Sequence, residues 1–174
     1  MDIILERARD WQDVRALNLA AFESSTEADL VDALRQQGEA TISVVALDEG
    51  RVIGHILFSP VTLNGQPAPR IAGLAPMAVV PGKQRQGIGS ALVREGLQHC
   101  RTSGFVALVV VGHAKYYPRF GFTPASRFGL RCEYEVPDDV FMAIELEAGA
   151  LKGCSGTIQY HPAFAEHPDG RRSD

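Results

Sequence analysis

The stretch that decides the fold runs from Met77 to Val93 and reads MAVVPGKQRQGIGSALV. An apolar strand breaks at Pro81-Gly82, and the pair Gly87 and Gly89 then leads directly into a helical pattern. Backbone N–H groups in the first turn of a helix lack helical partners and lie at the positive end of the helix dipole. Glycine lets an anion approach that backbone without a β-carbon in the way. The stretch therefore predicts a site for a phosphate or pyrophosphate.

Two other phosphate-binding loops do not fit this stretch. A dinucleotide-binding fingerprint needs a third small residue, at a position where this chain has Leu92. A Walker loop ends in Gly-Lys followed by Ser or Thr, whereas Gly89 is followed here by Ser90 and Ala91. The sequence thus favours a loop that holds the pyrophosphate of another cofactor.

Upstream of this stretch the residue pattern predicts helices that alternate with strands. Apolar residues recur three and four positions apart in the two helical segments, and Thr26 is the expected N-cap of the second. β-Branched runs joined by a tight polar turn predict an antiparallel hairpin, and a Pro- and Gly-rich loop is expected at 64–69. The expected elements are a strand at Ile3–Leu5, helices at Arg9–Phe22 and Thr26–Gln37, and strands at Ile42–Leu47, Val52–Pro60 and Ile71–Val80.

Downstream, the apolar run Phe105–Val111 has the length of a strand that is buried on both faces. Because a helix at Gly87–Thr102, stopped by Gly104, separates it from the preceding strand, the two strands should be parallel with a right-handed crossover. The remaining expected elements are a short helix at Ala114–Phe120 and strands at Phe128–Glu133, Val140–Leu146 and Thr157–Tyr160. The order predicts a single α/β domain over 1–160, with a frayed tail at 161–174.

Composition and charge exclude several classes of protein. The chain has 174 residues, of which 45% are hydrophobic and 22% are charged, and its net charge is −4. This balance argues against a dedicated nucleic-acid binder, which normally has a basic face. We expect no signal peptide and no membrane helix, and therefore a cytoplasmic protein. The three cysteines are widely spaced and predict neither a disulfide framework nor a zinc site.

Two motifs together resemble the GNAT superfamily of acetyl-CoA-dependent N-acetyltransferases. The first is Gln84-x-x-Gly87-x-Gly89 after an apolar strand, and the second is Tyr116-Tyr117-Pro118-Arg119-Phe120-Gly121-Phe122 about thirty residues later. The resemblance implies a mixed, mostly antiparallel sheet, flanked by helices, with a parallel, splayed strand pair at the cofactor site. It also implies transfer of an acetyl group from acetyl-CoA to a primary amine. A non-catalytic sensor of acyl-CoA on the same fold is the alternative.

The resemblance also implies site residues, each at the matching position of this sequence. Tyr117 matches the family tyrosine whose hydroxyl lies near the thioester sulfur, and Tyr116 is interpreted as a packing residue. An asparagine that is usual in the family after the strand ending near Val111 is missing, and His113 or Lys115 could cover its contact. The residues implied to hold the pantetheine arm and the pyrophosphate are Met77, Ala78, Val79, Gln84, Arg85, Gln86, Gly87, Ile88, Gly89 and Ser90.

An attacking amine must lose a proton, so the reaction needs a general base. Glu27 is the first candidate and His113 is an alternative, whereas His55 lies within a strand and is expected to be a structural histidine of the sheet. Cys100 lies on the apolar face of its helix, where a structural thiol is expected, so direct attack in a ternary complex is favoured over an acetyl-enzyme. No metal is expected. The acceptor is a small-molecule or protein amine, and a homodimer is left open.

Overall fold

The computed structural model describes residues 1–38 and 41–166 and is built on one sheet. Over these residues the sheet has nine strands, in the order β1-β2-β3-β4-β5-β8-β6, while β9 pairs with the far end of β3 and with β7. The strands are β1 (Asp2–Leu5), β2 (Ile42–Asp48), β3 (Arg51–Leu63), β4 (Gln66–Val79), β5 (Ala107–Val111), β6 (Thr123–Pro124), β7 (Leu130–Cys132), β8 (Phe141–Glu145) and β9 (Gly156–Gln159). Most pairs are antiparallel, as expected for a mixed sheet.

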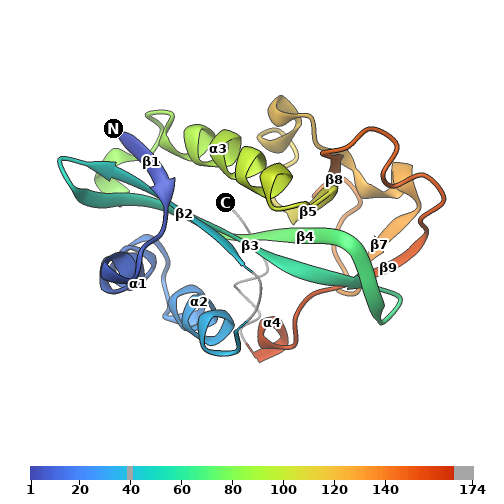
Figure 1. Cartoon of the computed structure of the whole chain (residues 1–174), viewed down its shortest axis with the longest axis horizontal. Helices are drawn as coiled ribbons and strands as arrows, with labels where there is room; N and C mark the ends of the chain where they lie inside the picture. Colours follow the sequence, from blue (N-terminus) through green and yellow to red (C-terminus); the bar gives the residue numbers. More distant parts are fainter. Residues whose placement is uncertain (39–40, 167–174) are drawn as a thin grey trace.

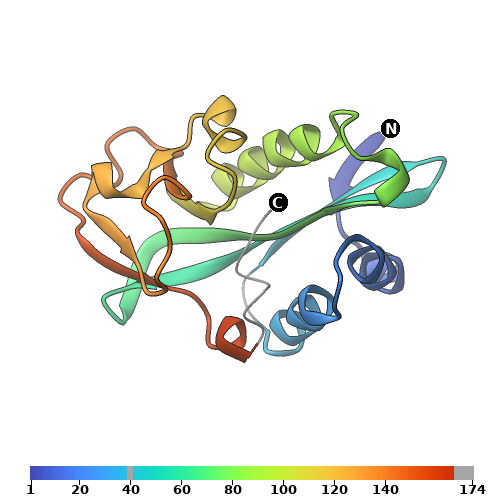
Figure 2. The ribbon, with the colours of Figure 1, turned by 180° about the vertical axis from the view of Figure 1, so that it is seen from behind.

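Helices cover both faces of this sheet. α1 (Trp11–Ala21), α2 (Thr26–Gln36) and α4 (Ala163–Glu166) lie on one face, and α3 (Ile88–Thr102) lies on the other (Figures 1 and 2). The buried apolar residues accordingly form two clusters, one on each side of the strands. Among the described residues, no helix is long and apolar enough to cross a membrane.

The strand pair at the glycine loop is parallel and splayed, which confirms the expectation. β4 pairs with β5 only from Ile71–Ala107 to Gly73–Val109. Beyond that point β4 follows β3 alone, and β5 follows β8. A β-bulge accompanies the divergence, because the register passes from Phe58–Leu74 to Ile56–Met77 and places two residues of β4 opposite one residue of β3. The sheet therefore opens between β4 and β5.

The expectation of a loop at 64–69 is wrong, because residues 66–69 belong to β4. β3 and β4 instead form one long hairpin that turns at Asn64 and Gly65. Both residues have positive φ, of 53° and 75°. An Asn-Gly pair adopts this conformation readily in two-residue hairpin turns, so the strands continue to the tip.

Three smaller expectations are also corrected. Ser25, not Thr26, is the N-cap of α2, and Thr26 is its first helical residue. The short strand β6 was not expected. The tail expected from His161 begins with α4, where Phe164 is fully buried on the face that also carries α2. Residues 167–174 lie outside the described part of the chain.

Candidate functional site

A cavity of about 710 Å³ lies beside the glycine loop. Its walls come from the end of α1, the end of β4, the loop and first turn of α3, and the segment after β5. All the cofactor residues expected from the sequence contribute to the lining except Gln86, which is exposed. The described lining consists of Ala21, Phe22, Met77, Ala78, Val79, Lys83, Gln84, Arg85, Gly87, Ile88, Gly89, Ser90, His113, Tyr116 and Arg119.

One end of the cavity has the geometry of an anion site. Gly87 is the N-cap of α3 and has a φ of 85°. The space beside its Cα is open, since no atom lies within 4 Å of the position where a β-carbon would stand. Arg85 also has positive φ, of 63°. The side chain of Gln84 donates to the carbonyl of Val79 across 3.2 Å and closes the loop. The first N–H groups of the 15-residue helix α3 therefore meet the cavity at an unobstructed turn.

The charges around the cavity also fit an anion. Lys83, Arg85 and Arg119 are in its lining, and the described lining contains no Asp or Glu, although the whole chain carries a net charge of −4. Lys83 is already paired with Asp48 across 2.9 Å, and this hydrogen bond holds the pKa of the Asp48 carboxyl below its usual value. A phosphate-bearing ligand would meet a cationic wall.

The other end of the cavity is the open edge of β4. Met77, Ala78 and Val79 line it, and their strand pairs there with β3 alone. An extended amide-containing chain can bind such an edge as a substitute strand. The site thus combines a phosphate cradle with a strand edge, which are the two features that CoA requires.

The two adjacent tyrosines lie in different environments. Tyr117 is fully buried and is outside the described lining, with its ring edge-on to Tyr116 at 5.0 Å and to Phe122 at 5.6 Å. Tyr116 packs on Tyr117 and Phe120, as expected of a packing residue, but it also lines the cavity. Its hydroxyl lies 3.2 Å from Ser90 Oγ. The interpretation of Tyr116 as packing alone is therefore incomplete.

The candidate bases are separated by their surroundings. Glu27 is buried in the first turn of α2, outside the described lining, whereas His113 lies in the lining and is exposed. His55 is fully buried between Asn18 Nδ2 at 3.3 Å and Ser43 Oγ at 2.9 Å, and burial lowers its pKa to about 3. His55 is therefore a neutral structural histidine, as the sequence suggested.

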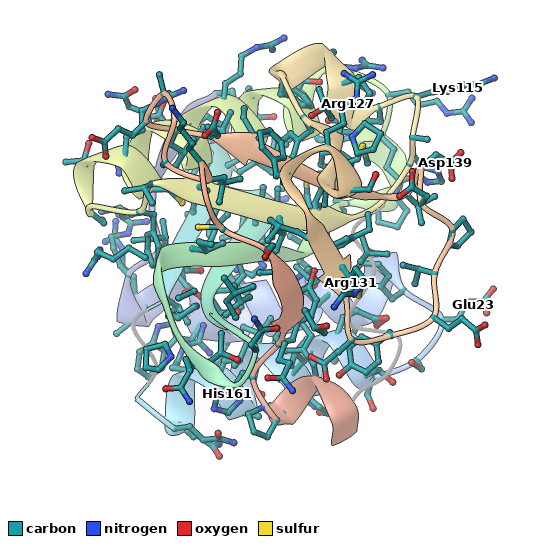
Figure 3. The ribbon with its side chains drawn as sticks, turned by 90° about the vertical axis from the view of Figure 1, so that its right-hand side faces the viewer. Glu23, Lys115, Arg127, Arg131, Asp139 and His161 are labelled. Carbon is teal, nitrogen blue, oxygen red and sulfur yellow. The ribbon has the colours of Figure 1, made fainter. Side chains whose placement is uncertain are left out.

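Two further residues have no place in the cavity. Lys115 extends outward from the surface (Figure 3), so of the two residues considered for the missing asparagine contact only His113 reaches the lining. Burial raises the pKa of the Cys100 thiol to about 12, in keeping with a structural role. Among the described residues, no group of His, Cys, Asp and Glu side chains could hold a metal ion.

Sequence and structure comparisons agree on one family. The family model "Acetyltransferase (GNAT) family" matches residues 9–122. The N-acetyltransferase YhbS of Escherichia coli is 39% identical over 165 residues, which cover 94% of this chain and 98% of YhbS. The crystal structure of E. coli YhbS in complex with CoA has a TM-score of 0.90 at 38% identity, covering 94% of this chain and 91% of that one. A GNAT family acetyltransferase from Brucella melitensis in complex with acetyl-CoA has a TM-score of 0.78 at 34% identity, covering 94% and 97%.

Proposed function

The chain belongs to the acetyltransferase (GNAT) family and is an acetyl-CoA-dependent acyltransferase, and from this premise we propose that it acetylates a primary amine by direct attack within a ternary complex. The observation that carries the proposal is the opening between β4 and β5 beside the N-terminus of α3. This opening offers a strand edge and a phosphate cradle to one ligand. Acetyl-CoA supplies the thioester when bound.

We assign the ten residues of β4 and the glycine loop to the two parts of that ligand. The backbone of Met77, Ala78 and Val79 would pair with the pantetheine amides, and one N–H of this edge would polarise the thioester carbonyl. The loop closed by Gln84 and the first turn of α3 would bind the pyrophosphate. The loop residues in this assignment are Arg85, Gln86, Gly87, Ile88, Gly89 and Ser90.

We assign Tyr117 to the departing thiolate, which is stabilised by a hydrogen bond or a proton from a hydroxyl. The hydroxyl of Tyr116 already has a hydrogen-bond partner in Ser90 of the first turn of α3, which we assign to the pyrophosphate. Tyr117 lies in the same buried cluster as Met77 of the open edge. Because Tyr117 is buried, this role requires that the pantetheine arm enter the opening and reach the hydroxyl.

The proton of the amine needs an acceptor, since an alkylammonium has an ordinary pKa near 10 and only the neutral amine attacks. We propose Glu27 as the base, acting directly or through water. Its support is its place in the first turn of α2, five residues along the chain from Phe22 of the cavity wall. His113, which lines the cavity, is the alternative.

A screen of primary amines with acetyl-CoA, read by release of free thiol, tests the proposed function. Polyamines, amino acids, aminoglycosides and peptides with a free N-terminus or lysine form the acceptor panel. Amine-dependent thiol release with formation of the acetamide is expected. Binding of acetyl-CoA in calorimetry without thiol release for any acceptor would favour the sensor alternative instead.

A further inference from the structure

Tyr116 joins the segment after β5 to the first turn of α3 at the mouth of the cavity. Its hydroxyl is within hydrogen-bonding distance of Ser90 Oγ, at 3.2 Å, and it would stand 3.2 Å from a β-carbon placed on Gly89. The contact sits at the end of the cavity that carries the anion site. Tyr116 therefore lies at the first turn of α3, where the structure has the geometry of an anion site.

The same tyrosine holds Arg119 in a defined position. Arg119 Nε donates to the carbonyl oxygen of Tyr116 at 2.9 Å, and the guanidinium carbon lies 4.5 Å from the centroid of the Tyr116 ring. Two contacts of different kinds thus fix the plane of this guanidinium, although Arg119 is an exposed residue. Exposed arginines held in this way keep their terminal amino groups for a further partner.

That partner is not a carboxylate among the residues the structure describes. The ion pairs of the described residues do not include Arg119, and the described cavity lining has no acidic side chain. Lys83, by contrast, is occupied by Asp48. Arg119 therefore brings an orientated guanidinium, unneutralised among the described residues, to the cavity wall that Tyr116 joins to the first turn of α3.

Resting on the function proposed above, we infer that Arg119 is a phosphate-binding residue for CoA and that Tyr116 is its positioning residue. A planar guanidinium binds phosphate through paired hydrogen bonds, which a lysine in the same place cannot form. The cofactor phosphates are then held from two sides, by the first turn of α3 and by Arg119. The enzyme consequently selects a phosphorylated carrier over pantetheine alone.

Calorimetric titration of the full chain tests the inference, because it needs no acceptor. The ligands are CoA, dephospho-CoA and pantetheine, and the variants are Arg119→Met, Arg119→Lys, Tyr116→Leu and the double variant. Arg94→Met is the matched control, since Arg94 stacks on Phe120 at 5.3 Å but does not line the cavity. Melting temperatures establish that each variant is folded.

We expect Arg119→Met to weaken CoA binding roughly ten- to hundredfold, the usual size of a lost charge-assisted hydrogen bond. Arg119→Lys should recover only part of this loss, and Arg94→Met should bind as the wild type does. An equal loss for dephospho-CoA assigns Arg119 to the pyrophosphate, and a loss confined to CoA assigns it to the 3′-phosphate. The effect of Arg119→Met should shrink in the Tyr116→Leu background.

Several outcomes would overturn the inference. Wild-type affinity in Arg119→Met, or an equal loss for pantetheine, would remove Arg119 from phosphate binding. Full recovery by Arg119→Lys, or strictly additive effects of the Arg119 and Tyr116 changes, would refute the positioning role. If Tyr116→Leu does not fold, the lysine variant alone decides that role. Absence of CoA binding by the wild type would instead refute the function on which the inference rests.

Discussion

The ring of Phe58 on β3 lies directly against the backbone of Gly96 in α3, so that a β-carbon at position 96 would stand 2.6 Å from Phe58 Cζ. This contact sets how closely the cofactor helix approaches the sheet. Phe58 is fully buried in the apolar cluster on the α3 side of the sheet, and Gly96 is a buried residue of α3.

Gly96→Ala should therefore destabilise the protein, although alanine is the better helix former. Overpacking of a tight core contact typically costs about 1 to 3 kcal/mol, which exceeds the gain of about 1 kcal/mol in helix propensity. Chemical denaturation measures the difference. Gly82→Ala is the control, because a β-carbon at Gly82 would meet no atom within 4 Å and the φ of Gly82 is not positive. A Gly96→Ala protein as stable as the control would mean that α3 can move away from Phe58 at no cost.

Gly87→Val should abolish detectable binding of acetyl-CoA while the protein remains folded. Valine is strained at φ of 85° and would carry two methyl groups into the space through which a phosphate reaches the α3 turn. Calorimetry and ligand-induced thermal stabilisation are the measurements. Gly149→Val is the matched control, since Gly149 has φ of 80° and equally open surroundings but is not in the cavity lining. Unchanged affinity in a folded Gly87→Val protein would show that the phosphates bind elsewhere.

His55 should make the protein lose stability as the pH falls below about 6.5. Its folded pKa is about 3, so the unfolded chain binds a proton at a pH where the folded chain does not. The stability is complete above the unfolded pKa and decreases by about 1.4 kcal/mol for each pH unit below it. Because the Asn18 Nδ2 amide faces His55 Nδ1, a proton on Nδ1 would place two N–H donors opposite each other.

Urea denaturation of the wild type and of His55→Gln between pH 7.5 and pH 5 measures this effect. The wild type should show the steeper decrease. Carboxylates such as Asp10, whose pKa is lowered by its bond to Arg7, act mainly below this range. Parallel curves for the two proteins would show that His55 takes up a proton as readily in the native state as in the unfolded state, which would contradict the lowered pKa.

The hairpin tip of β3 and β4 should depend on the side chain of Asn64. Its Oδ1 accepts from Thr157 N at 2.9 Å, and its Nδ2 donates to Ser155 O at 3.2 Å, which ties the tip to β9. Asn64→Ala loses both bonds and is strained at φ of 53°, for an expected cost of about 1 to 3 kcal/mol. Asn64→Gly removes the backbone strain but still loses both hydrogen bonds, so its stability should lie between those of the wild type and Asn64→Ala. Wild-type denaturation midpoints for both would show that backbone pairing alone holds the tip.

The sequence predicted what depends on local pattern. The sequence has a strand, then Gly87-x-Gly89, then a helical pattern and a buried strand. This order predicted the glycine loop, α3 and the parallel pairing of β4 with β5, and all three are present. Asn64-Gly65 is also a local turn signal, but the prolines at 67 and 69 suggested a loop, and only pairing with the neighbouring strand and with β9 decides the matter.

The environments of Tyr116 and Tyr117 could not be read from the sequence, because adjacent identical residues carry the same local signal. Packing against Phe122 buries one, and the cavity exposes the other. Phe22 in the cavity wall was missed for a similar reason. It comes from the end of α1, and only the packing of that helix against the sheet brings it to the site.

Tyr117→Phe should lower kcat for acetyl transfer by about 10² to 10⁴, with KM for acetyl-CoA nearly unchanged. The change keeps the ring and its contacts with Tyr116 and Phe122, so the fold should be retained, and it removes only the hydroxyl proposed for the thiolate. An interaction made mainly in the transition state has this kinetic pattern.

Tyr116→Phe should behave differently, because the Tyr116 hydroxyl contacts Ser90 at the first turn of α3. This variant should raise KM for acetyl-CoA modestly without a large change in kcat. The measurement compares both variants with the wild type, using any amine found in the acceptor screen at saturating concentration, together with their melting temperatures. Wild-type turnover in Tyr117→Phe would remove Tyr117 from the mechanism, and a loss of kcat in Tyr116→Phe instead would transfer the donor role to the tyrosine that lines the cavity.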